Sequence, residues 1–257
     1  MLSRDDVNPD RPDSSGSTSL LIASSYRDEG VVRLLLARDY FNPGQPDTSG
    51  QRPLWRACFN GDEGIVRQLL AKDNVNAGEP DSCRRTPLWW ASLRGNEGVV
   101  KLLLERDDVN PDKPGIEGGT PLWHASKNGH EVVVRLLLGR GDVNPDEPDN
   151  YDRTPLLMAS AYGHEGIVRL LLAKDDVNPD KPSELDQTPL SCASSNGHEG
   201  VVRLLLARDD VNLNRSDQYG LTPLWSACVN GREGIVRQLL ATVFPIVPSG
   251  RQGPGVL

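Results

Sequence analysis

A chain of 257 residues with 37% hydrophobic and 25% charged residues has the composition of a folded globular protein and excludes a disordered one. The formal net charge of −8 argues against a broad surface for binding nucleic acid or anionic lipid. No apolar stretch of signal-peptide length begins the chain, and no aliphatic run approaches the roughly 18 residues of a membrane span. We therefore predict a cytoplasmic protein, with the nucleus as the other compartment, that binds neither nucleic acid nor membrane.

Cysteine usage points to the same compartments. The chain has four cysteines, Cys58, Cys83, Cys192 and Cys228, and none of them forms a C-x-x-C pair. Three lie in stretches that read as packed helix. Reduced thiols fit this distribution better than a disulfide framework does.

A repeat of 34 residues organises the chain. Thr-Pro-Leu recurs at Thr86, Thr120, Thr154, Thr188 and Thr222, and the same step reaches Arg52 in Arg-Pro-Leu and Thr18 in Thr-Ser-Leu. These anchors define seven units, one to seven, with no insertion or deletion between them. A fixed period of this length is typical of a solenoid of stacked units.

In chain order, residues 1–17 precede the first anchor. Leu2 to Asn8 matches the segment 206–212, so we expect residues 1–17 to be the tail and hairpin of a truncated preceding unit. Two explanations stay open. Either the chain is a piece of a longer array, or the helices of that unit have been lost.

Each unit then predicts two helices and a loop. The Thr hydroxyl can cap a first helix and proline suits its first position, so a helix follows, as in 86–94, and ends at a glycine such as Gly95. A second helix begins at a glutamate and continues as Val-Val-Arg-Leu-Leu-Leu or a close relative. The segment Val-Asn-Pro-Asp-x-Pro-Asp comes next, and its prolines favour an extended turn.

The second helices repeat one charge pattern. Every unit places a glutamate four residues before an arginine or lysine, a spacing that stabilises a helix by roughly 0.2–0.5 kcal/mol. The pairs are Glu29/Arg33, Glu63/Arg67, Glu97/Lys101, Glu131/Arg135, Glu165/Arg169, Glu199/Arg203 and Glu233/Arg237. We interpret this face as the solvated outer face of the array. Residues 242–257 break the repeat, and we expect an irregular tail whose apolar start could cap the last unit.

The repeating unit resembles the ankyrin repeat. Thr188 to Asn212 reads T-P-L-x-x-A-S-x-x-G-H-E-G-V-V-R-L-L-L-x-x-x-x-V-N, and the resemblance covers residues 18–241. The tetratricopeptide repeat also has 34 residues, but its continuous helices would not tolerate two prolines in each loop. The resemblance implies an all-α ankyrin solenoid with short β-hairpin-like loops, and a monomer that binds another protein on its concave face.

The chain departs from the ankyrin pattern at one column. Where the family usually has histidine after Thr-Pro-Leu, tryptophan stands at Trp55, Trp89, Trp123 and Trp225. The histidine–threonine hydrogen bond of the family is therefore not expected here. A ladder of tryptophans packed between adjacent units is the predicted substitute.

No pattern of catalytic residues is present. A phosphate loop, H-E-x-x-H and G-x-S-x-G are all missing from the sequence. His130, His164 and His198 occupy one column of the repeat, which indicates a structural role at the turn between the two helices. His124 has no cysteine or second histidine at metal-ligand spacing. We predict no catalytic, cofactor or metal site, and a protein that is not an enzyme.

The partner-binding residues are expected in the variable columns. Counted from the anchor, positions +2, +5, +6 and +9 of the first helix form a core face, whereas +4, +7 and +8 and the loop tips differ between units. Several of these side chains are large or aromatic, as is typical of interfaces, although exposed positions also drift freely. The predicted binding residues are Arg56, Phe59, Trp90, Arg94, His124, Tyr151, Met158, Tyr162 and Tyr219.

Two functions follow from these observations. The first is a protein-interaction scaffold that uses the concave face of units two to five. The second is a sensor or regulatory segment of a larger protein, such as an NTPase-linked (NACHT-type) immune receptor, because near-identical ankyrin units resemble those of filamentous-fungal proteins of that kind.

Overall fold

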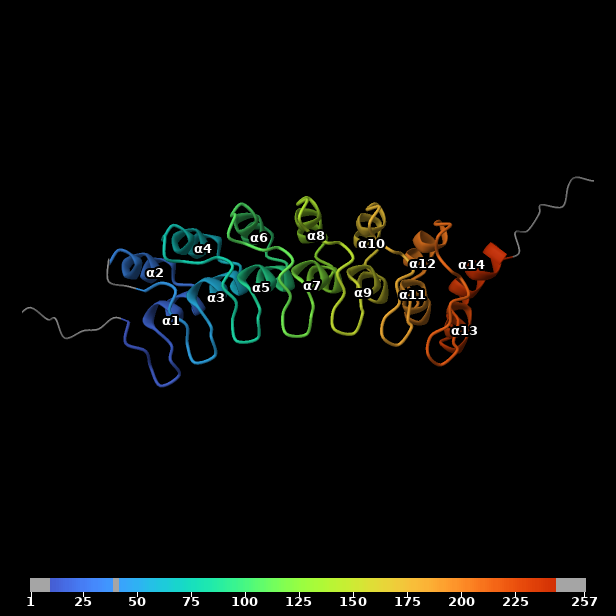
Figure 1. Cartoon of the computed structure of the whole chain (residues 1–257), viewed down its shortest axis with the longest axis horizontal. Helices are drawn as coiled ribbons and strands as arrows, with labels where there is room; N and C mark the ends of the chain where they lie inside the picture. The colour runs from blue at the N-terminus through green and yellow to red at the C-terminus, as the bar shows by residue number, and fades with distance from the viewer. Residues whose placement is uncertain (1–9, 39–41, 244–257) are drawn as a thin grey trace, which may run out of the picture.

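The computed structural model describes residues 10–38 and 42–243, which contain 14 helices and no strand. The helices form seven pairs in two parallel rows (Figure 1). The first helices are α1 (Ser19–Ser25), α3 (Pro53–Asn60), α5 (Pro87–Arg94), α7 (Pro121–Asn128), α9 (Pro155–Ala161), α11 (Pro189–Asn196) and α13 (Pro223–Val229). The second helices are α2 (Glu29–Leu36), α4 (Glu63–Leu70), α6 (Glu97–Leu104), α8 (Glu131–Leu138), α10 (Glu165–Leu172), α12 (Glu199–Leu206) and α14 (Glu233–Val243).

In six of the seven described units the first helix begins at a proline and a glycine ends or closely follows it, as the sequence predicts, whereas α1 begins at Ser19 and has Tyr26 at its end. In α5 the hydroxyl of Thr86 accepts a hydrogen bond from the Trp89 amide at 3.1 Å, and proline occupies the first turn. The helix stops at Gly95, whose φ of 72° is left-handed and therefore suits glycine. Arg52 takes the place of threonine before α3 and supplies no side-chain cap.

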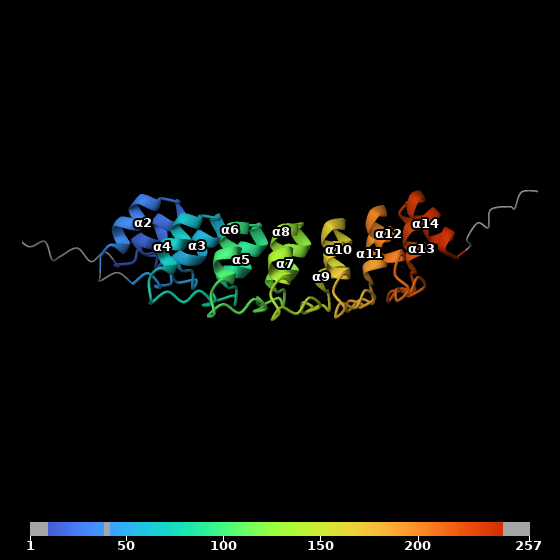
Figure 2. The same cartoon turned by 90° about the horizontal axis from the view of Figure 1, so that it is seen from above.

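Helices pack mainly within each unit and against the helices of neighbouring units. Each first helix contacts the next first helix, and each second helix contacts the next second helix. The array is therefore elongated, and it curves gently so that the first helices and the loops lie on the concave side (Figures 1 and 2). The predicted core face is confirmed at +2, +5 and +6, where Leu88, Ala91 and Ser92 are fully buried, whereas Gly95 at +9 is only partly buried.

The loops form a row of fingers, which we define as residues 13–17, 47–51, 81–85, 115–119, 149–153, 183–187 and 217–221. In the second unit's finger the amide of Asp81 donates to the carbonyl of Arg85 at 3.0 Å, and the Asp81 carboxylate accepts the amides of Cys83 and Arg85. Neighbouring tips share hydrogen bonds, such as Asn150 N to Glu117 O at 3.1 Å and Asn150 Nδ2 to Ile116 O at 3.0 Å. The fingers are thus hairpins in outline, as expected, but contain no strand in the described chain.

The second helices carry the predicted charge pattern in a modified form. Of the seven predicted pairs, three form ion pairs among the described residues: Glu63–Arg67, Glu131–Arg135 and Glu233–Arg237. The glutamate also reaches the next unit. A Cβ at Gly64 would lie 2.6 Å from Glu29 Oε2, so the carboxylate rests against the first turn of the next second helix, where the helix dipole favours a negative charge.

The histidine column joins adjacent units at the turn between their helices. His130, His164 and His198 place Nε2 within 3.1 Å of the carbonyls of Leu93, Lys127 and Ala161 in the preceding unit. A carbonyl only accepts hydrogen bonds, so Nε2 donates. The structural role predicted for this column is consistent with this geometry.

Replacing Gly163 by alanine should destabilise the array more than the same change at Gly231. Both residues follow a first helix with positive φ, 78° and 65°, so each variant should lose about 1 kcal/mol from a strained backbone. A Cβ at Gly163 would also lie 2.5 Å from His198 Nδ1, whereas nothing lies within 4 Å at Gly231. Displacing the histidine should cost about 1 kcal/mol more. Urea unfolding of both variants measures the difference, and equal losses would show that the histidine contact adds no stability.

At both ends of the chain, only part of the predicted structure falls within the described residues. Helix α14 continues through Val243, two residues beyond the predicted end of the array at residue 241. The first finger, residues 13–17, closes like the others. The rest of the predicted preceding-unit tail, residues 1–9, and the predicted cap, from residue 244 onward, lie outside the described residues.

Candidate protein-binding surface

The tryptophan column forms a ladder between units, as predicted. Trp55, Trp89 and Trp123 are buried, and the indole N–H of Trp89 donates to the carbonyl of Gly119 at 3.0 Å. Trp123 makes the equivalent bond to Arg153 O at 2.8 Å. In the seventh unit, the last one in the described part of the chain, Trp225 is 50% exposed. The ladder therefore depends on neighbouring units for its burial.

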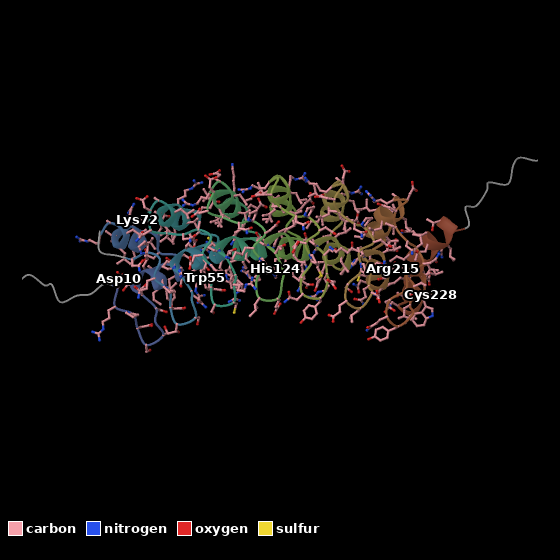
Figure 3. All side chains as sticks on the ribbon, in the orientation of Figure 1. Asp10, Trp55, Lys72, His124, Arg215 and Cys228 are labelled. Atoms are coloured by element: carbon pink, nitrogen blue, oxygen red, sulfur yellow. The ribbon has the colours of Figure 1, made fainter. Side chains whose placement is uncertain are left out.

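Each step of the ladder contacts the +4 residue of the next unit. Trp55 stacks on Trp90 with ring centroids 5.5 Å apart, and Trp89 lies 4.2 Å from the His124 ring. Trp55 and His124 lie along the row of first helices (Figure 3). Met158 packs with Trp123 in the same way. The +4 column thus belongs mainly to the contacts between units.

This packing corrects the expectation that the +4 side chains are exposed. Met158 is only 4% exposed, because Trp123 and Leu157 cover it. Trp90 and His124 are half-buried. A partner can therefore reach little of Met158, and part of Trp90 is already occupied by contacts within the array.

Burial also changes the acid–base behaviour of His124. Desolvation between Trp89 and Trp123 lowers the pKa of His124 to about 4, and the charge of Lys127 adds to the shift. The charge of Asp149 acts in the opposite direction and only partly offsets it. The imidazole is therefore neutral at physiological pH.

Four of the predicted residues gather over units two and three. Phe59 meets Trp90 edge to face at 5.1 Å, and the Arg94 guanidinium lies 4.8 Å from the Phe59 ring. Arg56 lies 5.5 Å from the ring of Trp55, on which Trp90 stacks. Together these side chains make an aromatic and basic patch on the concave side.

The three predicted tyrosines are exposed, as expected. Tyr151 and Tyr162 are each 52% exposed, and Tyr219 is 73% exposed. Arg153 lies 4.8 Å from the Tyr151 ring, and Lys127 lies 5.8 Å from the Tyr162 ring. Tyr219 stands apart, on the sixth unit's finger beside the exposed Trp225.

Several residues of this surface were not predicted. Arg85 lies 4.4 Å from the Trp90 ring while its Nε donates to Asp81 at 2.8 Å, and Arg153 pairs with Asp149 in the same manner. The sequence contained a pattern that could have identified these arginines. In each of the two fingers an aspartate is followed four residues later by the arginine, as Asp81/Arg85 and Asp149/Arg153. Ile116 lies at the third unit's finger tip, one of the variable positions, and is 61% exposed, but it was not among the predicted binding residues.

A small cavity opens at the third finger. This finger has glycines, Gly115 and Gly119, where the fingers of units two and four have the aspartate–arginine pair. The missing side chains leave a hollow of about 190 Å³ lined by Trp89, Ile116 and His124, with Cys83, Arg85, Glu117 and the two glycines completing it. A cavity of about 150 Å³ is large enough for a benzene ring, so one apolar side chain of a partner fits here.

In residues 10–38 and 42–243, no three His, Cys, Asp or Glu side chains come together as metal ligands, and no helix is long and apolar enough to cross a membrane. The four cysteines are free, and burial raises the pKa of the Cys192 thiol to about 11.

Comparison with known proteins agrees with the observed architecture. The family model of ankyrin repeats (3 copies) matches residues 20–114, 88–183 and 174–246, which overlap to span most of the chain. A search of curated proteins gives no match. The ankyrin fold is typically non-catalytic, and its repeats generally mediate binding between proteins. The chain belongs to the ankyrin repeat family.

Proposed function

We propose that the protein is a scaffold that binds another protein on its concave face. The supporting observation is the distribution of exposed large apolar side chains in units two to five, residues 52–187. Four of the five lie at finger tips or at the end of a first helix, namely Ile116, Tyr151, Tyr162 and Leu185, and the fifth, Val132, lies on a second helix. Exposed apolar and aromatic groups gathered on one face are typical of protein interfaces.

Structural packing does not account for these side chains. Trp55, Trp89 and Trp123 are buried in the ladder, whereas the tyrosines keep half or more of their surface in solvent. Tyrosine at an interface supplies a large contact area at a small cost in conformational entropy. The proposed face runs over units two to five and includes the patch around Phe59 and Arg94.

Truncating exposed side chains on this face should weaken partner binding without unfolding the array. We expect the variant Ile116→Ala/Tyr151→Ala/Tyr162→Ala to lose at least about 2 kcal/mol of affinity, roughly thirtyfold. Affinity capture from cells, with the captured proteins then titrated in purified form, measures this effect. Trp90 is left unchanged, because its contacts with Trp55 and Phe59 would mix stability with binding.

The matched control is the outer-face variant Arg67→Ala/Val132→Ala, whose two side chains are exposed on second helices. Proteins captured by the parent chain should also bind this control. If they bind the concave-face variant as tightly as the parent and lose the control, the outer face is the binding site.

A further inference from the structure

The first helices carry charge of only one sign. Their seven ranges contain three residues charged at neutral pH, and all three are basic: Arg56, Arg94 and Lys127. None of these helices contains an aspartate or glutamate, although the whole chain has 36 acidic and 28 basic residues. The first helices, which lie on the concave face, therefore form a locally basic surface in a protein of net charge −8.

These three cations have no acidic partner in the part of the chain that the structure describes. Arg56, Arg94 and Lys127 form no ion pair there. Nearby cations differ, since Arg85 and Arg153 are held by the carboxylates of Asp81 and Asp149 in their own fingers. Those two arginines have their counter-charge within the fold, and the three on the first helices do not.

Aromatic rings orient the three unpaired cations. The Arg56 guanidinium lies 5.5 Å from the Trp55 ring and the Arg94 guanidinium 4.8 Å from the Phe59 ring. Lys127 Nζ lies 5.3 Å from the Trp123 ring. A cation–π contact holds a cation in place without neutralising its charge. The positive charges are thus positioned and remain available to a ligand.

The acids that border this face lie at finger tips. Glu117 and Asp152 are exposed on the fingers of units three and four, at the rim of the face. Acidic groups of a ligand would be repelled near these tips and attracted over the first helices. The charge pattern thus favours a ligand segment that lies along the helices, with its apolar side chains reaching the cavity at Trp89 and the exposed Tyr162 ring.

We propose that the partner presents an acidic segment to the first helices of units two to four, with its carboxylates facing Arg56, Arg94 and Lys127. The inference rests on the proposed function, because it names the chemistry of the ligand for the same concave face. The overall negative charge of the chain opposes acidic ligands elsewhere, so the local patch also selects where such a segment docks.

Selection of peptides on the whole chain tests this proposal. A phage-displayed library of random twelve-residue peptides is selected on the parent chain, and recovered peptides are synthesised and titrated. We expect enrichment of Asp and Glu over the unselected library. The variant Arg56→Gln/Arg94→Gln/Lys127→Gln should weaken their binding about tenfold or more, and the charge-preserving Arg56→Lys/Arg94→Lys should retain most of it.

The matched control removes three arginines from the outer face, Arg67→Gln/Arg135→Gln/Arg169→Gln, with the same change in net charge. Thermal melting of every variant confirms that it folds. Equal weakening by the control, or selected peptides without acidic enrichment, overturns the proposal. If such non-acidic peptides still lose binding to the Tyr151→Ala/Tyr162→Ala variant, the concave-face function stands and only the acidic specificity is wrong. If no peptide depends on the concave face, both proposals fail.

Discussion

Replacing Trp123 by alanine is expected to destabilise the array by about 3–5 kcal/mol, the usual cost of removing a buried tryptophan from a core. Trp123 is buried, packs against Leu157 and Met158 of the next unit, and donates its indole N–H to the Arg153 carbonyl at 2.8 Å. Its removal leaves a cavity at the contact between two units and deprives that carbonyl of its indole donor. The free energy of unfolding from urea titrations measures the loss.

Trp225 provides the matched control within the same chain. It occupies the same column of the seventh unit, but it is 50% exposed, because no further unit packs over it in the described structure. Trp225→Ala should therefore cost clearly less stability than Trp123→Ala. If the two variants unfold at the same urea concentration, burial between units is not what makes the ladder stabilising.

A second large effect is expected from acid. The folded chain holds the pKa of His124 at about 4, while an unfolded histidine titrates near 6.5. Between pH 6.5 and pH 4, His124 is protonated in the unfolded chain but remains neutral in the folded chain. The free energy of unfolding therefore falls as the pH drops from about 6.5 toward 4. The loss from this one residue should amount to about 2 kcal/mol at pH 5 and about 3 kcal/mol near pH 4.

The variant His124→Met isolates this contribution. Methionine occupies the equivalent position in unit five, where Met158 is buried, so it suits the site. Other groups, including Asp112 and Asp146, whose pKa values burial raises, are unchanged in the variant. The unfolding free energy of the variant minus that of the parent should therefore be about 2 kcal/mol more positive at pH 5 than at pH 7. A difference that does not depend on pH would show that His124 is not buried in the neutral form.

The fold could be predicted almost completely from the sequence, because it is a local structure repeated. Thr86 and Gly95 mark the two ends of a helix by chemistry that needs no knowledge of distant residues. Once one unit is understood, the fixed 34-residue step places the others. The contacts between second helices were harder to predict from the sequence. Glu63 lies against the helix that begins at Glu97, and a contact between two units cannot be recognised in the sequence of one unit.

The candidate surface could be predicted only in part. Helix geometry correctly identified the variable face, and Tyr151 and Tyr162 are exposed on it. The burial of Met158 could not be seen, because it depends on Trp123, a residue 35 positions earlier in the neighbouring unit. The exposure of a residue on the variable face thus depends on which residue the preceding unit places against it. Comparing equivalent positions of the repeat one at a time does not show this.

The glutamate that rests on the next helix has a consequence for how the array bends. Its contact needs a glycine at the second residue of that helix, because a Cβ would meet the carboxylate, as at Gly64 and Gly98. Unit four alone replaces this glycine, with Val132, so Glu97 cannot settle there in the same way. Units three and four therefore lack the glutamate–helix contact that the other neighbouring units have on their outer side. We expect the array to bend most easily between these two units, directly behind the cavity at Trp89 and His124, and such bending would change the width of the concave face.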